Sequence, residues 1–152
     1  PVRMLKKELF RTHVMEPLRI LIADDHKQTR HNLRNYLHQS GVCEGIGEAH
    51  DGIQALILAL ELEPDILLLD VEMPGLRGTD VALELKKRGK KLSILAISAH
   101  KERQFIKSLL ESGAAGYILK DEALETILTA IEDIQKGERG WVSQDISELL
   151  TH

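Results

Sequence analysis

The strongest sequence signal for the fold of this chain lies in residues 64–75, PDILLLDVEMPG. Four consecutive apolar residues follow a proline and an aspartate, and the run ends on Asp70. A short, continuous apolar run between turn signals is typical of a strand that is buried on both faces of a parallel sheet. The Pro74-Gly75 turn cannot continue a central strand, because proline lacks the N–H that the ladder needs. We therefore expect Asp70 at the carboxyl end of a strand, where open α/β sheets bind ligands, although a turn-capping aspartate is the alternative.

Strands and helices alternate on both sides of this stretch. The predicted strands are short apolar runs, and the predicted helices carry apolar residues at helical spacing. Connections of helix length imply parallel strands that are joined by right-handed crossovers. The predicted fold is therefore α/β, a doubly wound five-stranded parallel sheet with strand order 2-1-3-4-5. Strands are predicted over residues 18–23, 45–49, 66–70, 92–97 and 116–119, and helices over 26–39, 52–62, 79–89, 100–112 and 121–136.

The bulk properties of the chain narrow its class. Its 152 residues fit one domain with a proper core. The formal net charge of -4 argues against a domain whose main surface grips nucleic acid. The single cysteine, Cys43, excludes an intramolecular disulfide and fits a reducing compartment. Because no apolar stretch approaches the ~18 residues of a membrane span, we expect a cytoplasmic protein without a membrane partner.

Polar side chains stand where the predicted strands end. They share one edge of a parallel sheet, and three of them are carboxylates that repel one another. A divalent cation removes that repulsion, and hard oxygen ligands with open water positions suit Mg²⁺. An aspartate can act as a nucleophile toward phosphorus, while a lysine stabilises the charge on the transferring group. The strand-end residues are Asp24, Asp25, Asp70, Ser98 and Lys120.

Taken in order, these motifs resemble the receiver domain of bacterial two-component response regulators. They read IADD at residues 22–25, DVEMPGLRG at 70–78, SA at 98–99 and GYILK at 116–120. The resemblance covers roughly residues 18–136 and implies the flavodoxin-like receiver fold. It also implies a protein that accepts a phosphoryl group rather than an enzyme with its own substrate.

The resemblance gives the acidic residues their roles. By it, Asp70 is the phosphoacceptor for a sensor histidine kinase. Asp25 and Asp70 would bind Mg²⁺ through their side chains, and Glu72 would add its backbone carbonyl. Asp24 would act through metal-bound water.

The same resemblance gives roles to residues at the ends of the last two predicted strands. Ser98 and Lys120 would contact the phosphoryl oxygens. Tyr117 matches the switch aromatic of the family, which turns inward when Ser98 moves toward the phosphate.

The end of the chain resembles one subclass of the family. Lys120 is followed by Asp121 where receivers often carry proline, as in the subclass whose output is a LuxR-type helix-turn-helix domain. The stretch GERGWVS at residues 137–143 looks like the linker of that subclass. We expect an N-terminal extension or start-site artefact over residues 1–16, a receiver over 17–137, and a linker toward an absent output domain over 138–152. We also expect a homodimer on phosphorylation, and DNA binding by a full-length protein but not by this chain.

Two other kinds of function stay open. The chain could be a stand-alone receiver, or a pseudo-receiver that acts by protein–protein binding without phosphorylation. A metal-dependent aspartyl phosphatase shares the nucleophile and the metal, but such enzymes carry an Asp-x-Asp motif at the nucleophile, where the second acid of this chain is Glu72.

The seven histidines lack metal-binding spacing, so we expect them to be surface residues.

Overall fold

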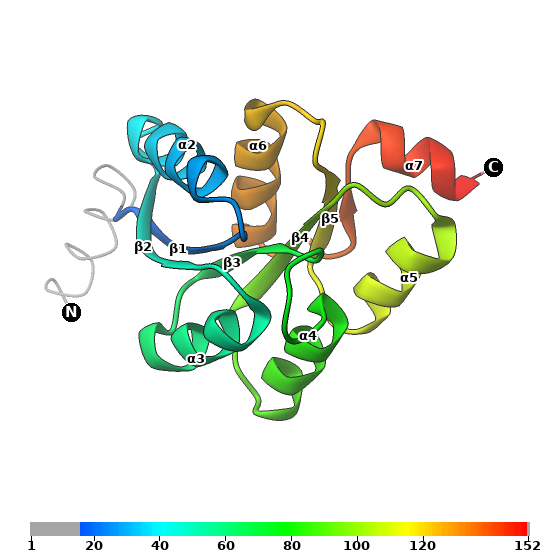
Figure 1. Cartoon of the computed structure of the whole chain (residues 1–152). Helices are drawn as coiled ribbons and strands as arrows, with labels where there is room; N and C mark the ends of the chain where they lie inside the picture. The colour runs from blue at the N-terminus through cyan, green and yellow to red at the C-terminus, as the bar shows by residue number, and fades with distance from the viewer. Residues whose placement is uncertain (1–15, 152) are drawn as a thin grey trace, which may run out of the picture.

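The computed structural model describes residues 16–151, and Figure 1 shows the arrangement of its elements. Strands and helices alternate along the chain as the sequence predicts. The extension expected at the N-terminus lies outside the described residues, apart from Glu16. The elements are β1 (Leu18–Ala23), α2 (Lys27–Gln39), β2 (Cys43–Ala49), α3 (Gly52–Leu62), β3 (Ile66–Asp70), α4 (Gly78–Lys87), β4 (Ser93–Ser98), α5 (Arg103–Glu111), β5 (Gly116–Leu119), α6 (Leu124–Gln135), β6 (Trp141–Val142) and α7 (Gln144–Thr151).

All the strands are parallel and form one sheet in the order β2-β1-β3-β4-β5-β6. The doubly wound α/β fold and the order of the first five strands are confirmed, but the prediction of five strands is wrong. The sixth strand is only two residues long, and Trp141 lies opposite Gly116 in register. Its pairing begins with the Trp141 N–H, which donates to the Ala115 carbonyl at 2.9 Å. So short a strand is held by its neighbour, and its own sequence carries no periodic signal.

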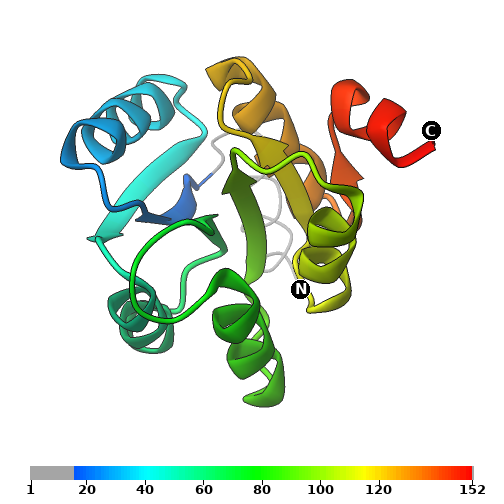
Figure 2. The same ribbon diagram turned by 45° about the vertical axis from the view of Figure 1, so that its right-hand side comes forward.

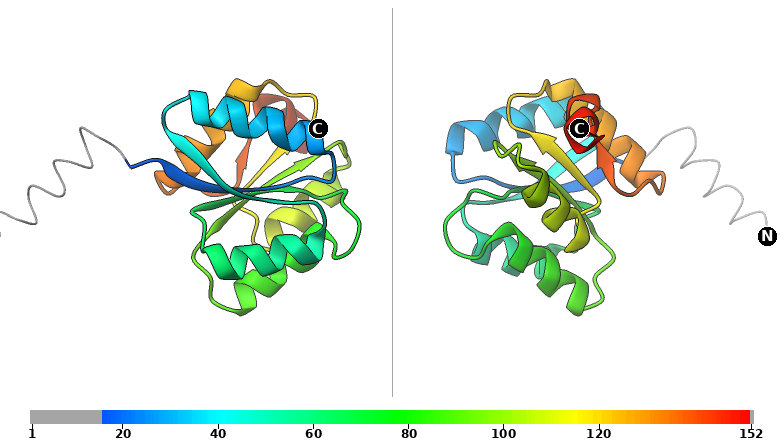
Figure 3. Two further views of the ribbon diagram at one scale, coloured as in Figure 1. Left: turned by 60° about the vertical axis from the view of Figure 1, so that its left-hand side comes forward. Right: turned by 90° about the vertical axis from the view of Figure 1, so that its right-hand side faces the viewer.

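Helices cover both faces of the sheet, as the left view of Figure 3 shows. Alternate residues of the central strands point to opposite faces, which divides the core into two clusters. Leu67 and Leu69 of β3 join the cluster under α3, α4 and α5, whereas Ile66 and Leu68 join the cluster under α2 and α6. β3 is buried along its whole length, and a strand covered on both faces needs apolar residues at successive positions, as residues 66–69 are.

The loop between β3 and α4 is fixed by close backbone packing. The Gly52 N–H, at the start of α3, donates to the Pro74 carbonyl at 3.1 Å. A Cβ on Gly52 would overlap the carbonyl oxygen of Leu76. Gly75 has a φ of +88°, which favours glycine. The segment that leaves Asp70 is therefore held against the first turn of α3.

The residues that follow α6 pack on the edge of the sheet. Helix α7 lies at the β5–β6 edge of the sheet, in red in Figure 2. Its Ile146 is fully buried and belongs to the core cluster on the α5 side. Arg103, the first residue of α5, donates to the Leu149 carbonyl of α7 at 3.3 Å. Residues 138–152, predicted as a linker, thus begin with elements that pack on the sheet.

Two helices start later than the sequence predicts, α5 at Arg103 and α6 at Leu124. Before α5, the Tyr117 hydroxyl donates to the His100 carbonyl at 2.9 Å, and the His100 N–H donates to Ser98 Oγ at 3.0 Å. A helix that began at His100 would use the His100 carbonyl for its first intrahelical bond, so the Tyr117 hydroxyl competes with the helix for that carbonyl. Among residues 16–151, no helix is long and apolar enough to cross a membrane.

Candidate functional site

The carboxyl ends of β1, β3, β4 and β5 bring the predicted site residues to one edge of the sheet. Asp24 follows β1, Asp70 ends β3, Ser98 ends β4 and Lys120 follows β5. As whole residues, Asp24, Asp70 and Ser98 are buried, at 4%, 2% and 0% exposure. The edge therefore carries buried polar residues at the strand ends.

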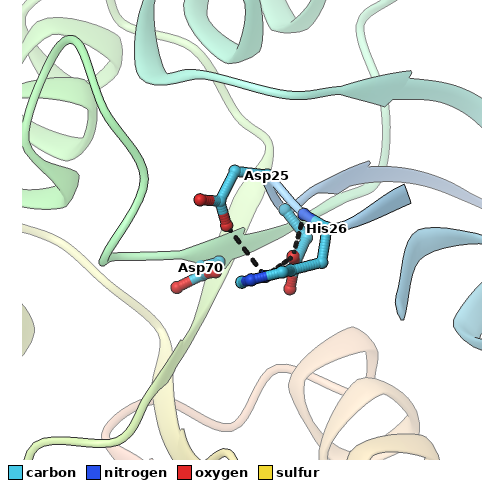
Figure 4. Close-up of side chains that lie close together, drawn as sticks. Asp25, His26 and Asp70 are labelled. Carbon is cyan, nitrogen blue, oxygen red and sulfur yellow. Dashed lines mark hydrogen bonds and ion pairs between the residues drawn. The ribbon is translucent and has the colours of Figure 1, made fainter. Parts of the chain in front are cut away.

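Three carboxylates converge beside His26, as Figure 4 shows for Asp25, His26 and Asp70. One oxygen each of Asp24, Asp25 and Asp70 and one ring nitrogen of His26 all lie within 4.8 Å of one another. His26 Nδ1 is 3.0 Å from Asp25 Oδ1 and 3.2 Å from Asp24 Oδ1. The backbone N–H of His26 also donates to Asp24 Oδ1 at 2.8 Å, which fixes that carboxylate.

Asp70 is the most confined of the carboxylates. Its Oδ1 accepts the Glu72 N–H at 2.9 Å, and its Oδ2 forms an ion pair with Lys120 Nζ at 3.0 Å. Burial raises the pKa of Asp70, and the negative charge of Asp24 raises it further, whereas the Glu72 N–H and Lys120 oppose the rise. Although partial burial disfavours its charge, Lys120 has a raised pKa, because it lies between Asp70 and Glu72. Because the pKa of Asp70 is still raised, Lys120 does not offset the burial of Asp70 and the charge of Asp24.

The residues present fit a hard divalent cation. Asp70 Oδ2 is buried, and it accepts no well-aligned hydrogen bond from residues 16–151 beyond its ion pair with Lys120. The oxygens of Asp24 and Asp25 face it from the end of β1. Carboxylate oxygens from two neighbouring strand ends are the donors that Mg²⁺ takes in proteins, together with water.

The Glu72 side chain lies away from this carboxylate cluster, on the β4 side of Asp70. Its Oε1 accepts the Ala99 N–H at 2.8 Å and the Ser98 hydroxyl at 3.0 Å. Its Oε2 is 3.3 Å from Lys120 Nζ. Despite partial burial, which acts in the opposite sense, these donors lower the pKa of Glu72. One carboxylate therefore joins the ends of β4 and β5.

Tyr117 lies beneath the site and not in it. Its side chain is fully buried, and its ring meets Phe105 edge to face with 6.5 Å between the ring centres. Burial raises the pKa of the Tyr117 hydroxyl to about 12, so the group is a neutral donor to the His100 carbonyl. The predicted switch aromatic is in the inward position here, next to the loop that carries Ser98.

Sequence reasoning missed three features of the site. His26 is exposed, as expected of the histidines, with 66% of its side chain accessible, yet its ring reaches the carboxylates. Its place directly after Asp25 was the available signal. The contacts of the Glu72 side chain and of the Ala99 N–H join segments 27 residues apart, and neither residue type announces them.

Known proteins resemble this chain in sequence and in fold. The family model for the response regulator receiver domain matches residues 20–132. The transcriptional regulatory protein NarL of Mycobacterium tuberculosis is 38% identical over 122 residues, which are 80% of this chain and 56% of that protein. Its signal receiver domain, solved alone, superimposes with a TM-score of 0.78 at 38% identity, covering 81% of this chain and 99% of that one. A LuxR-family two-component response regulator from Aurantimonas gives a TM-score of 0.83 at 29% identity, covering 90% and 96%.

The chain is a receiver domain and belongs to the response regulator family, with NarL-type and LuxR-family regulators among its relatives. It spans little more than half the length of the NarL protein that it matches. The names of these relatives describe a transcriptional regulatory protein and a two-component response regulator.

Proposed function

We propose that this chain accepts a phosphoryl group on Asp70 from a sensor histidine kinase, with Mg²⁺ bound beside it. The observation that carries the proposal is the buried Asp70 carboxylate, which lies 3.0 Å from Lys120 Nζ and faces two further aspartates. This arrangement supplies a nucleophile, a cation site and a positive charge at one strand edge. The intact acidic set also favours a phosphoacceptor over a pseudo-receiver.

Each residue has a proposed part in the transfer. Asp25 and Asp70 would hold Mg²⁺ through their carboxylates, Glu72 through its backbone carbonyl and Asp24 through a bound water. When bound, the ion offsets the charge of the carboxylates and of the transferring group. A carboxylate oxygen of Asp70 forms the new bond to phosphorus as the bond from phosphorus to the donor nitrogen breaks, and that electron pair returns to the imidazole. Lys120 then stabilises the charge on the phosphoryl oxygens.

The response to phosphorylation would run through Ser98 and Tyr117. The phosphoryl group adds about -1.5 to -2 charges. Ser98 would donate its hydroxyl to a phosphoryl oxygen, and this movement would favour the inward position of Tyr117 that the structure already shows. The face made by α5, β5 and α6 would then favour a homodimer.

The output of this switch would be transcriptional. The relatives NarL and the Aurantimonas regulator support a LuxR-type DNA-binding domain after this receiver. Residues 17–137 would form the receiver, and 138–152 would lead from its β5–β6 edge toward that domain. Membership of the response regulator family supports a non-enzymatic, cytoplasmic regulator. The net charge of -4 supports DNA contacts by the output domain rather than by this chain.

Intact-mass analysis after incubation with acetyl phosphate tests the proposal. Wild-type protein should gain one phosphoryl group when Mg²⁺ is present and none after chelation. Asp70→Asn should not be labelled, whereas Asp80→Asn, a change at an exposed aspartate of α4, should be labelled like the wild type. Equal labelling of Asp70→Asn would refute the assignment.

A further inference from the structure

The donors that would bind a phosphoryl group are already bound to an anion of the protein itself. The Ser98 hydroxyl and the Ala99 N–H both donate to Glu72 Oε1, at 3.0 and 2.8 Å. Lys120 Nζ stands 3.3 Å from Glu72 Oε2. These three donors lie beside Asp70, whose own Oδ2 shares the same ammonium group at 3.0 Å. Together the Ser98 hydroxyl, the Ala99 N–H and Lys120 Nζ form a binding site for a tetrahedral or planar anion next to the nucleophile, which we call the phosphoryl seat.

We propose that the Glu72 carboxylate is a built-in occupant of the phosphoryl seat, and that it must leave before a phosphoryl group on Asp70 can use Ser98, Ala99 and Lys120. The inference rests on the proposed function of Asp70. It gives Glu72 a side-chain role that differs from the backbone role of a metal ligand. The residue would set how readily the site accepts a phosphoryl group.

The geometry supports occupancy rather than a passing contact. Only 27% of the Glu72 side chain is exposed, and the donors reach it from the ends of two neighbouring strands. Hydrogen bonds to a charged acceptor are about twice as strong as neutral ones. A backbone N–H and a buried hydroxyl are fixed donors, so they lose little freedom when they bind the carboxylate. The carboxylate is therefore a real competitor for the incoming anion.

The effect on ligand affinity follows from the population of the open seat. When the competent state is a fraction of all molecules, the apparent dissociation constant rises by the inverse of that fraction. If the seat is open in about one molecule in ten, removal of the Glu72 side chain tightens binding of a phosphoryl mimic by about tenfold. The side chain also places a negative charge near the incoming anion, so the test has to separate occupancy from charge alone.

Beryllofluoride binding, followed by ¹⁹F NMR at saturating Mg²⁺, makes that separation with three variants. Glu72→Ala should bind the probe about tenfold more tightly than the wild type. Glu72→Asp keeps the charge, but its shorter side chain cannot bridge the donors, so it should bind nearly as tightly as Glu72→Ala. Glu111→Gln is the matched control, because Glu111 is an exposed carboxylate at the last residue of α5, and no hydrogen bond or ion pair joins it to Glu72 or to the three donors. It should bind like the wild type.

A second measurement needs no ligand. In ¹H–¹⁵N spectra of the free protein, the Ala99 amide proton should move upfield in both Glu72 variants, because its charged acceptor is lost, while Glu111→Gln leaves it in place. Affinity of Glu72→Ala within twofold of the wild type, wild-type behaviour of Glu72→Asp, or an unmoved Ala99 amide would each overturn the inference. If no protein binds beryllofluoride but the Ala99 amide moves as expected, the proposed function fails, and Glu72 is a structural anion only.

Discussion

Two ion-pair clusters in this molecule have opposite charge balance. At the β2 edge, Glu48 pairs with two arginines of α2, with Arg30 Nε at 3.1 Å and Arg34 Nη1 at 2.8 Å. Although partial burial opposes it, the two guanidinium groups lower the pKa of Glu48. This Glu48 cluster contains more positive than negative charge, and both carboxylate oxygens are paired.

The site at the carboxyl edge is the reverse case. Lys120 is shared by Asp70 and Glu72, while Asp24 lies close enough to raise the pKa of Asp70. The Glu48 cluster is complete and serves to fasten α2 to β2. The site has unbalanced negative charge at the buried Asp70, and a bound divalent cation would offset it. The same residue types thus stabilise one region and prepare the other for a ligand.

The largest expected difference between the two regions comes from removing a cation. Lys120→Met should destabilise the metal-free protein by about 2 kcal/mol, because it leaves the buried Asp70 carboxylate without its partner. Proton uptake by Asp70 limits the loss. Arg34→Met should cost less than about 1 kcal/mol, because Arg30 still pairs with Glu48 at a partly exposed site. Urea unfolding at pH 7 measures both values, and equal losses would contradict the contrast.

Exchange of a carboxylate for its amide should give opposite signs in the two regions. Asp70→Asn removes a buried, crowded charge and should stabilise the metal-free protein by about 1 kcal/mol. Glu48→Gln loses two charge-assisted pairs and should destabilise it by roughly 0.5–1 kcal/mol. The midpoints of urea unfolding at neutral pH, compared at equal slope, report the signs. Destabilisation by Asp70→Asn would mean that the site is balanced without a cation.

Acidification should remove both the stabilisation by Asp70→Asn and the destabilisation by Glu48→Gln. This loss is the smallest of the expected changes in unfolding free energy. The pKa of Asp70 is raised above its ordinary 3.8, so its penalty is absent below that value and grows as pH rises through the raised pKa. The pKa of Glu48 is lowered from 4.5, so its stabilisation is present above 4.5 and is lost as pH falls through the lowered value. Unfolding free energies of both variants and the wild type should therefore converge once the pH is below the lowered pKa of Glu48. Persistence of either difference there would show that packing, and not charge, causes it.

The fold and most of the site could be predicted because they rest on local signals. The apolar run that ends on Asp70 indicated a buried parallel strand, and the structure buries all of β3. Asp24, Ser98 and Lys120 follow apolar runs in the same way, so the topology alone brings them to one edge.

The rest depends on contacts between distant segments. Strand β6 is two residues that pair because β5 has a free edge, and the Trp141 indole donates to Asp133 of α6 at 3.0 Å. The late start of α5 accompanies a bond from the Tyr117 hydroxyl of β5 to the His100 carbonyl, a contact between segments 17 residues apart. The Glu72 carboxylate reaches Ser98 across the sheet edge, and no spacing in the sequence encodes that reach.

Unfolding free energy as a function of MgCl₂ concentration, at constant ionic strength and pH 7, tests most directly whether the carboxyl edge lacks a cation. A ligand that binds only the folded state at 100 times its dissociation constant stabilises it by about 2.7 kcal/mol. Wild-type protein and Glu48→Gln should both gain stability along that curve, and Asp70→Asn should gain little. No gain by the wild type, or an equal gain by Asp70→Asn, would contradict the assignment of Asp70 and its neighbours as a magnesium-dependent site.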